Sequence, residues 1–374
     1  MEHRQPPAVN RSHMQFQPVF EKKERPILIA GPCSAETEEQ VLETARGLQK
    51  VGIDLFRAGI WKPRTRPGAF EGVGAPGLKW LQKVKQETGI KVTTEVANTQ
   101  HVFDAMKHGI DVFWIGARTT VNPFSVQEVA DAMQGLDVPV LIKNPINADL
   151  KLWIGAIERI YKAGITRIGA IHRGFHYHGE TKYRNTPMWQ LPIELKRQFP
   201  DLQIICDNSH ICGRRDLLQN IAQQALDLNY DGLMTEVHPT PDNAWSDAEQ
   251  QITPHRFGIM VKELVVREQT TDNASFLKTI DYLRHRIDEI DNQLMDLFGK
   301  RMEVADQIGE YKKENNIAIL QPTRWNEILE HACLLGKEKG LSKRFVETVL
   351  RAVHQESISH QAKVMNEEVE FIDD

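Results

Sequence analysis

From residue 27 onward, the chain alternates short apolar runs with longer amphipathic stretches. The runs are rich in aliphatic and β-branched residues, and each is followed by a stretch long enough for a helix. Buried parallel strands have this continuous apolar character, because helices cover the sheet that they form. The eight runs cover residues 27–31, 54–59, 91–96, 111–117, 139–144, 166–174, 202–210 and 232–237.

Eight strand–helix units are the number that closes a parallel barrel. An open doubly wound sheet is the alternative, but no glycine-rich dinucleotide fingerprint follows the first run. We therefore predict an α/β TIM (β/α)8 barrel over residues 26–268, preceded by an N-terminal extension over residues 1–25. The role of this extension is open, and a cover for the barrel floor is one interpretation.

The pattern changes after the polar stretch QTTDNAS, which indicates a linker over residues 269–276. Beyond it, apolar residues recur at steps of three and four from Leu277 to Ile308, as in a long amphipathic helix that ends near residue 315. Pro322 suits the first turn of a second helix, and Ser342 suits the N-cap of a third. Residues 277–374 are therefore predicted to form an all-α helical domain.

The composition narrows the class of protein. A net charge of −5 argues against nucleic acid or an anionic membrane surface as a partner. No apolar run approaches the roughly 18 residues of a membrane span, and residues 1–25 lack the apolar core of a signal peptide. Four cysteines in 374 residues do not suggest a disulfide framework, so the expected location is cytoplasmic.

Cations gather where the predicted strands end, which is where such barrels place their catalytic groups. Buried side by side they would repel one another unless an anion lay among them, and guanidinium groups suit phosphate and carboxylate oxygens. An ion pair with a nearby acid is the alternative for each one. We call these residues the rim cations: Arg57, Lys62, Arg64, Arg118, Lys143 and Arg173.

A second set combines a thiol, an imidazole and two carboxylates. Cys33 follows the first predicted strand, His210 ends the seventh run, Glu236 ends the eighth strand, and Asp247 lies in the loop beyond. The first, seventh and eighth strands are neighbours in a closed barrel, so these side chains can converge. The mixed donors suit manganese, iron, zinc or cobalt rather than calcium or magnesium, with manganese as the default expectation.

The barrel region resembles the 3-deoxy-D-arabino-heptulosonate 7-phosphate (DAHP) synthases, especially their compact-barrel branch. The resemblance covers about residues 25–265 and rests on GPCSAET, RAGIWKPRTRPGAFEG, IGART, IKN, HRG, DNSH and GLMTEVHPTPDNAWSDAEQ. It implies a metal-dependent condensation of phosphoenolpyruvate with erythrose 4-phosphate. A related family, the octulosonate 8-phosphate synthases, uses arabinose 5-phosphate and carries a KANRS-like sequence where this chain has Lys62-Pro63-Arg64-Thr65.

The same resemblance implies roles for individual residues. Lys62, Cys33 and His210 would be catalytic. The candidates for moving the proton of the attacking water are Lys62 and Glu95, and Glu95 is considered only because it ends the third predicted strand. Phosphoenolpyruvate would contact Arg57, Lys62, Arg118, Lys143 and Arg173. Erythrose 4-phosphate would contact Lys62, Pro63, Arg64, Thr65 and Asp247. The metal would be held by Cys33, His210, Glu236 and Asp247.

The helical region resembles the all-helical chorismate mutases over about residues 277–363, on LRHRIDEIDNQLMDLFGKRMEVADQIGEYK, QPTRW and ESISHQ. It implies rearrangement of chorismate to prephenate, a pericyclic reaction that requires no acid, base or nucleophile. Arg301, Lys312 and Gln361 would be catalytic, with Lys312 and Gln361 donating to the ether oxygen as negative charge develops there. The implied chorismate contacts are Arg284, Arg301, Lys312, Arg324, Ser357 and Gln361.

Two features of this region qualify the resemblance. Arg284 would lie about 25 Å from Arg301 on a straight helix, so one small ligand could meet both only if Arg284 came from a second chain. A homodimer through the helical domain is therefore expected. Trp325 and Gln321 also stand where many members of the family have acidic residues.

The leading interpretation is thus a bifunctional enzyme of the shikimate pathway and of aromatic amino acid biosynthesis. In the alternative, the helical domain is an allosteric module that senses chorismate or prephenate and dimerises the chain. A solvated dimerisation module without a ligand and a noncatalytic barrel are the remaining possibilities.

Overall fold

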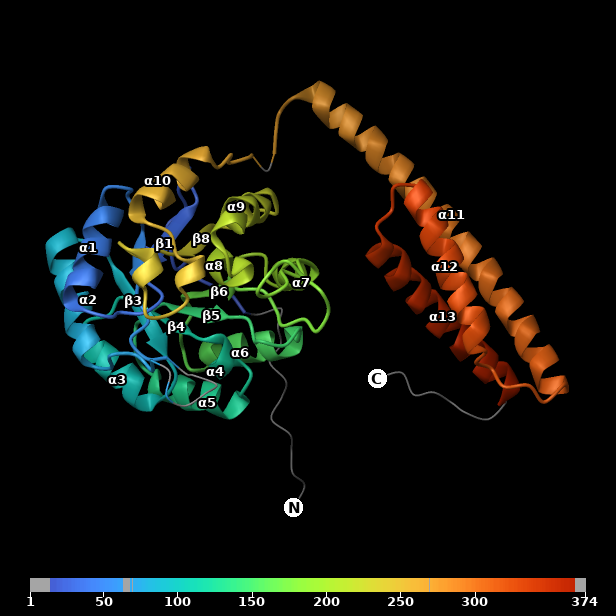
Figure 1. The fold of residues 1–374 in the computed structure, drawn as a ribbon, viewed down its shortest axis with the longest axis horizontal. Helices are drawn as coiled ribbons and strands as arrows, with labels where there is room; N and C mark the ends of the chain where they lie inside the picture. Colours follow the sequence, from blue (N-terminus) through green and yellow to red (C-terminus); the bar gives the residue numbers. More distant parts are fainter. Residues whose placement is uncertain (1–13, 63–67, 69, 269, 367–374) are drawn as a thin grey trace, which may run out of the picture. The chain divides into compact units, whose positions relative to one another are not determined.

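The computed structural model describes residues 14–62, 68, 70–268 and 270–366. The chain forms two compact units, which divide between residues 269 and 270. The first unit is a closed parallel barrel, and the second is built from three helices (Figure 1). The predicted (β/α)8 barrel and the all-α second domain are both confirmed.

The barrel strands follow one another in chain order around the sheet. The strands are β1 (Ile27–Gly31), β2 (Leu55–Arg57), β3 (Val92–Val96), β4 (Val112–Ile115), β5 (Val140–Lys143), β6 (Ile168–His172), β7 (Gln203–Asp207) and β8 (Gly232–Glu236). β1 and β8 pair in parallel and close the barrel, with Gly31 opposite Glu236. The last residues of the first and last strands are thereby brought side by side.

Helices follow the strands, and the longer ones cover the outside of the barrel. They are α1 (Glu38–Gln49), α2 (Pro76–Thr88), α3 (Thr99–Lys107), α4 (Ala117–Thr120), α5 (Pro123–Ala132), α6 (Leu150–Lys162), α7 (Gln190–Gln198), α8 (Asn208–Cys212), α9 (Leu218–Asp227) and α10 (Pro254–Glu263). Several begin at a residue whose side chain caps the first turn, as Thr37 does for α1 and Asn98 for α3. Their apolar faces pack on the strands and form one continuous core.

A second apolar cluster fills the barrel interior and includes Ile29, Trp114 and Met234. Val19 and Phe20 pack against it, and the Gln203 side chain, at the start of β7, accepts from the backbone amides of both residues. This part of the N-terminal extension therefore covers the floor of the barrel, opposite the ends of the strands that carry the candidate site.

Gly31 is expected to tolerate no side chain, because a Cβ there would lie 1.9 Å from the Arg57 carbonyl oxygen of β2. Gly31→Ala should therefore lower the free energy of unfolding by about 1–3 kcal/mol, as overpacking does. A Cβ at Gly155 in α6 would meet no heavy atom within 4 Å, so Gly155→Ala should raise the free energy of unfolding by about 0.5–1 kcal/mol. Urea denaturation of both variants checks the pair, and equal effects of the two would contradict it.

The second unit consists of α11 (Ala274–Glu314), α12 (Pro322–Glu338) and α13 (Lys343–Met365). α13 packs against both α11 and α12. The prediction that the linker extends to residue 276 is wrong, because the Asn273 side chain accepts from the Phe276 amide and starts α11 at Ala274. Pro322 in the first turn of α12 and Ser342 as the N-cap of α13 are confirmed.

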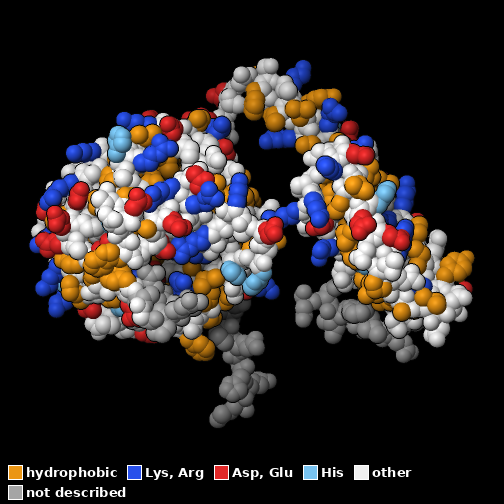
Figure 2. Space-filling model, in the orientation of Figure 1, with side chains coloured by type: hydrophobic (Ala, Val, Ile, Leu, Met, Phe, Trp, Pro, Cys, Tyr) orange, Lys and Arg blue, Asp and Glu red, His pale blue; other side chains and the backbone are white. Residues whose placement is uncertain are grey.

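Much of the apolar face of α11 is exposed in the single chain. Its buried residues are Met302, Ala305 and Gly309, in the C-terminal half of the helix. Hydrophobic side chains are visible along the surface of this unit (Figure 2). The exposed ones on α11 include Leu277, Leu283, Ile287, Ile290, Leu294, Leu297, Val304 and Ile308. None of the helices in the described part of the chain is long and apolar enough to cross a bilayer.

Candidate active sites

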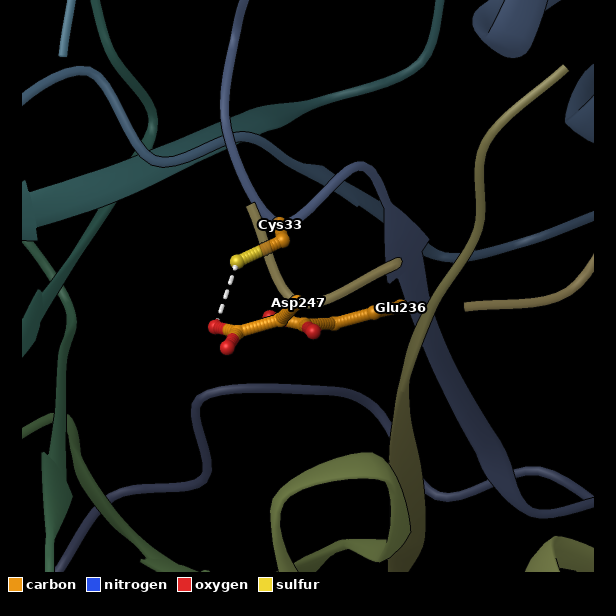
Figure 3. Close-up of side chains that lie close together, drawn as sticks. All are labelled: Cys33, Glu236 and Asp247. Carbon is orange, nitrogen blue, oxygen red and sulfur yellow. Dashed lines mark hydrogen bonds between the residues drawn. The ribbon is translucent and has the colours of Figure 1, made fainter. Parts of the chain in front are cut away.

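Three of the predicted metal ligands lie together at the seam between β1 and β8. Cys33 follows β1, Glu236 ends β8, and Asp247 lies in the loop before α10 (Figure 3). Their sulfur and carboxylate oxygen atoms all lie within 4.8 Å of one another. The Cys33 thiol donates to Asp247 Oδ2 at 3.2 Å. We call these three residues the donor cluster.

The donor cluster combines a neutral thiol with two ionised carboxylates. Burial, followed by the charge of Glu236, raises the pKa of Cys33 to about 12. Burial also raises the pKa of Asp247 and of Glu236, but the charge of Arg184, followed by that of His210 when it is protonated, outweighs it for Asp247, and protonated His210 and Arg57 do so for Glu236. The pKa of each carboxyl group is therefore lowered. A divalent cation could replace the thiol proton, and its positive charge would then offset the negative charges of the thiolate and the two carboxylates.

His210 lies beside the donor cluster rather than within it. Its Nε2 is 3.7 Å from Glu236 Oε1, while its Nδ1 is 2.9 Å from Asp207 Oδ1. Burial raises the pKa of Asp207, but His210 and Lys143 lower it well below its usual value, so this carboxylate can only accept. The Nδ1 atom must therefore carry the proton, which leaves Nε2 with a lone pair. This is the orientation that a carboxylate imposes on a metal-binding histidine.

The donors present fit a transition-metal ion. A thiol and two carboxylates converge on one place, and the His210 imidazole lies beside them. Burial lowers the pKa of His210, which favours the neutral form that binds a metal. Calcium or magnesium would favour an all-oxygen set instead.

Two rim cations lie directly against the donor cluster. Arg57 is 1% exposed and donates from Nη1 to Glu236 Oε1 at 2.9 Å and from Nη2 to the Cys33 carbonyl at 3.1 Å. Its Nε has no partner among the described residues. The Lys62 ammonium donates to the same carbonyl and lies 3.2 Å from Cys33 Sγ.

One further rim cation, Lys143, is buried against polar and aromatic partners. Lys143 Nζ is 2.7 Å from Asp207 Oδ2, and both Lys143 and Arg57 lie over the Trp114 ring, at 5.7 and 4.9 Å from its centroid. Trp114 in turn donates from Nε1 to Glu95 Oε2 at 3.0 Å. Two rim cations thus lie against one buried indole.

The remaining described rim cations, Arg173 and Arg118, are close enough for their charges to interact. Burial, partly offset by Asp207 and reinforced by the charges of Arg184 and Arg118, lowers the pKa of Arg173 to about 10. Arg118 is exposed on α4. An anion among these guanidinium groups would relieve their repulsion. The predicted contacts Pro63, Arg64 and Thr65 lie outside the described residues.

Five residues of this site were not selected from the sequence: Trp114, Asp207, Arg184, Asn185 and Gln250. Asp207 ends β7, and this position at a strand end could have identified it as a site residue. Arg184 and Asn185 lie in the loop between β6 and α7, which no periodicity marks. A cavity of about 560 Å³ is lined in part by Arg184, Asp247 and Gln250. Another, of about 680 Å³ between α1 and α10, contains none of the predicted site residues.

The helical unit brings together four of the six predicted chorismate contacts. Arg301 on α11 donates to Ser357 Oγ on α13, and Lys312 donates to Gln361 Oε1 at 3.1 Å. Ser357 and Gln361 are both buried. Burial lowers the pKa of Lys312. Two cations and two hydrogen-bonding side chains thus line the same α11–α13 interface.

The remaining two contacts are not part of these hydrogen-bonded pairs. Arg284 is exposed, about 25 Å before Arg301 along α11 at 1.5 Å per residue. Arg324 is exposed and pairs with Glu327 at 3.0 Å. Trp325, the residue that departs from the family pattern, stacks on His354 with centroids 4.0 Å apart.

Comparison with known proteins agrees with the two-unit architecture. The family model of the DAHP synthetase I family matches residues 13–270, and that of chorismate mutase type II matches residues 283–362. Phospho-2-dehydro-3-deoxyheptonate aldolase of Thermotoga maritima is 32% identical over 237 residues, or 63% of this chain and 68% of that protein. The 2-dehydro-3-deoxyphosphooctonate aldolase of Vesicomyosocius okutanii is 27% identical over 272 residues, or 67% of this chain and 94% of the relative.

A solved structure gives the same result. The crystal structure of the DAHP synthase from Thermotoga maritima matches with a TM-score of 0.57 and 31% identity, covering 63% of this chain and 67% of that one. The chain therefore belongs to the DAHP synthetase I family and joins its synthase barrel to a chorismate mutase type II domain, which makes it a bifunctional enzyme of the shikimate pathway.

Proposed function

We propose that residues 26–268 condense phosphoenolpyruvate with erythrose 4-phosphate to DAHP, with a divalent cation, and that residues 277–374 rearrange chorismate to prephenate. The observation that carries the first half is the donor cluster, which lies against Arg57 and Lys62 at the β1–β8 seam. All four cysteines are free thiols, which fits a cytoplasmic enzyme.

The rim cations would hold the phosphate and carboxylate of phosphoenolpyruvate. Lys62, Arg118, Lys143 and Arg173 are the candidates with the strongest support, because they carry positive charge at four different strand ends. Arg57 already pairs with Glu236 through Nη1 and with the Cys33 carbonyl through Nη2, so Nε is its nitrogen without a partner among the described residues. Binding two anions among these groups would bring the reactants together and neutralise their charges.

Lys62 and Asp247 would face erythrose 4-phosphate, together with Pro63, Arg64 and Thr65. Cys33, His210, Glu236 and Asp247 would hold the cation, with manganese as the default. A bound cation would supply Lewis acidity that polarises the sugar aldehyde towards carbon 3 of the enol. Lys62 lies 3.2 Å from Cys33 Sγ, so its ammonium is suited to hold or deliver a proton beside the reacting carbons.

Turnover is expected with erythrose 4-phosphate and not with arabinose 5-phosphate, and only in the presence of a divalent cation. The measurement is phosphate release from phosphoenolpyruvate after chelation and again after addition of Mn²⁺. Activity that survived thorough chelation would remove the cation from the proposal. Turnover of the five-carbon sugar would assign the barrel to the octulosonate 8-phosphate reaction instead.

In the helical domain, Arg301 would bind a carboxylate of chorismate, while Lys312 and Gln361 would donate to the ether oxygen. Their alignment along α11 and α13 supports this assignment. Arg324 and Ser357 would add contacts, and Arg284 would come from a second chain. The exposed apolar face of α11 supports such a homodimer, because a large apolar surface on a soluble domain usually has a partner.

A mixing experiment tests the shared site. Arg284→Ala and Arg301→Ala should each lower mutase activity about 10- to 100-fold, the value of a lost charged hydrogen bond of about 1.5–3 kcal/mol. When both chains are mixed and allowed to exchange, half of the dimers would contain one of each, with one intact site of two, so activity should return to about a quarter of wild type by two-fold symmetry. The Arg286→Ala variant, in which the cation over Tyr282 is removed, serves as the control.

No recovery on mixing, although exchange of chains is demonstrated, would place Arg284 outside the mutase site. Binding of chorismate without any turnover by wild type would favour the alternative in which the helical domain is a sensing and regulatory module.

A further inference from the structure

The Asn185 side chain connects the two halves of the barrel site. Its Oδ1 accepts from Arg173 Nη1 at 2.7 Å, and its Nδ2 donates to the His210 carbonyl at 2.6 Å. A guanidinium group can only donate and a carbonyl can only accept, so both partners fix the orientation of the amide. Asn185 is 7% exposed, and it therefore joins a rim cation to a proposed metal ligand in a buried place.

Its neighbour Arg184 contacts one carboxylate of the donor cluster directly and the other through Gln250. One guanidinium nitrogen, Nη1, donates to Asp247 Oδ1 at 2.9 Å and to Gln250 Oε1 at 2.7 Å. Gln250 in turn donates from Nε2 to Glu236 Oε2 at 2.6 Å. Asp247 has a φ of 48°, a left-handed conformation that a non-glycine residue keeps only where its surroundings hold it.

The backbone beneath these side chains is also fixed. The amides of Arg184 and Asn185 donate to the carbonyls of Cys212 and Ile211, at the end of the helix α8 that carries His210. Two glycines allow the close approach: a Cβ at Gly174 would lie 2.5 Å from the Asn185 carbonyl oxygen, and one at Gly213 would lie 2.5 Å from Arg184 Cβ. The dipeptide is thus built into the site.

We propose that Arg184 and Asn185 are positioning residues that couple the cation site to the phosphoenolpyruvate site. The inference rests on the proposed function of the barrel. A cation that orders His210 and Asp247 would also order Asn185, and with it the Arg173 guanidinium that meets phosphoenolpyruvate. Such coupling is reciprocal, so phosphoenolpyruvate would raise the affinity for the cation by the same factor.

The test is titration of the metal-free full chain with Mn²⁺, alone and with saturating phosphoenolpyruvate. In wild type, phosphoenolpyruvate should raise Mn²⁺ affinity about 5- to 150-fold. Asn185→Ala should remove most of this factor. Asn185→Asp should do the same, since it keeps the acceptor for Arg173 but loses the donor to His210; being isosteric, it decides the matter if the alanine variant does not fold.

Arg184→Gln should weaken Mn²⁺ binding about 10- to 100-fold, as loss of a ligand's hydrogen-bonding partner does. Arg214→Gln is the matched control: it removes a guanidinium from an exposed pair with Asp216, just beyond α8, and should leave Mn²⁺ binding unchanged. Normal coupling in both Asn185 variants, or wild-type Mn²⁺ affinity in Arg184→Gln, would overturn the inference. The inference would also be overturned if phosphoenolpyruvate left the Mn²⁺ affinity of the wild type unchanged, and the proposed function would then still stand. A wild-type chain that binds neither Mn²⁺ nor phosphoenolpyruvate would overturn both.

Discussion

Cys33→Ala is expected to slow the condensation about 10³-fold and to leave the chorismate reaction unchanged. The thiol is the one sulfur donor of the cluster and lies within hydrogen-bonding distance of both Asp247 and Lys62. Without it the cation would be lost or poorly held, and Lewis-acid assistance of several kcal/mol would go with it. A loss of about 4 kcal/mol corresponds to about 10³ in rate.

The measurement is phosphate release from phosphoenolpyruvate, with the manganese content of the purified chain determined in parallel. Cys333→Ser in the helical unit, a partly exposed free thiol, is the matched control and should retain both activities. Full condensation activity in Cys33→Ala would exclude Cys33 as a ligand. Equal loss of both activities would instead indicate a general folding defect.

Lys312→Met should lower kcat of the chorismate rearrangement about 10²- to 10³-fold, the effect of removing one donor from a developing negative charge. Lys312 donates to Gln361 Oε1 at the α11–α13 interface, so its ammonium and the Gln361 amide are held side by side. Methionine keeps most of the length of the chain but cannot donate. The effect should appear mainly in kcat, because the charge on the ether oxygen develops only in the transition state.

Lys313 provides the comparison for this variant. It is the next residue on α11, and its ammonium donates to the Val364 carbonyl at 3.2 Å on the surface. Lys313→Met should therefore change mutase kcat little, while condensation by the barrel should be normal in both variants. A loss confined to KM in Lys312→Met would mean that Lys312 only binds the substrate.

The barrel could be predicted because parallel strands and their helices leave a regular alternation in the sequence. The positions of Cys33, Glu236 and Lys143 followed from it, since each ends or directly follows a strand. Pro322 and Ser342 were equally predictable, because their effects on a helix terminus are local. The start of α11 was missed because Asn273 resembles the polar residues of a linker until its cap is seen.

Other features depend on contacts far apart in the chain. Arg57 was placed at a strand end, but nothing in its position indicated that its guanidinium would turn to Glu236, 179 residues away. Arg184 and Asn185 lie in an irregular loop whose path is fixed by the carbonyls of α8 and by two glycines. Sequence periodicity describes strands and helices and carries no information on such loops.

The pairing of β1 with β8 has a consequence for how the barrel forms. Cys33 and Glu236 come from the first and last strands, so the donor cluster cannot exist until the whole barrel chain has been synthesised and its ends have met. Closing so long a loop is a slow, entropically costly event in folding. A cation that binds only the closed barrel would stabilise it by about 2.7 kcal/mol at a hundred times its dissociation constant. In a cell short of that metal, the synthase would then lose resistance to proteolysis as well as catalysis, and its abundance would follow the metal supply.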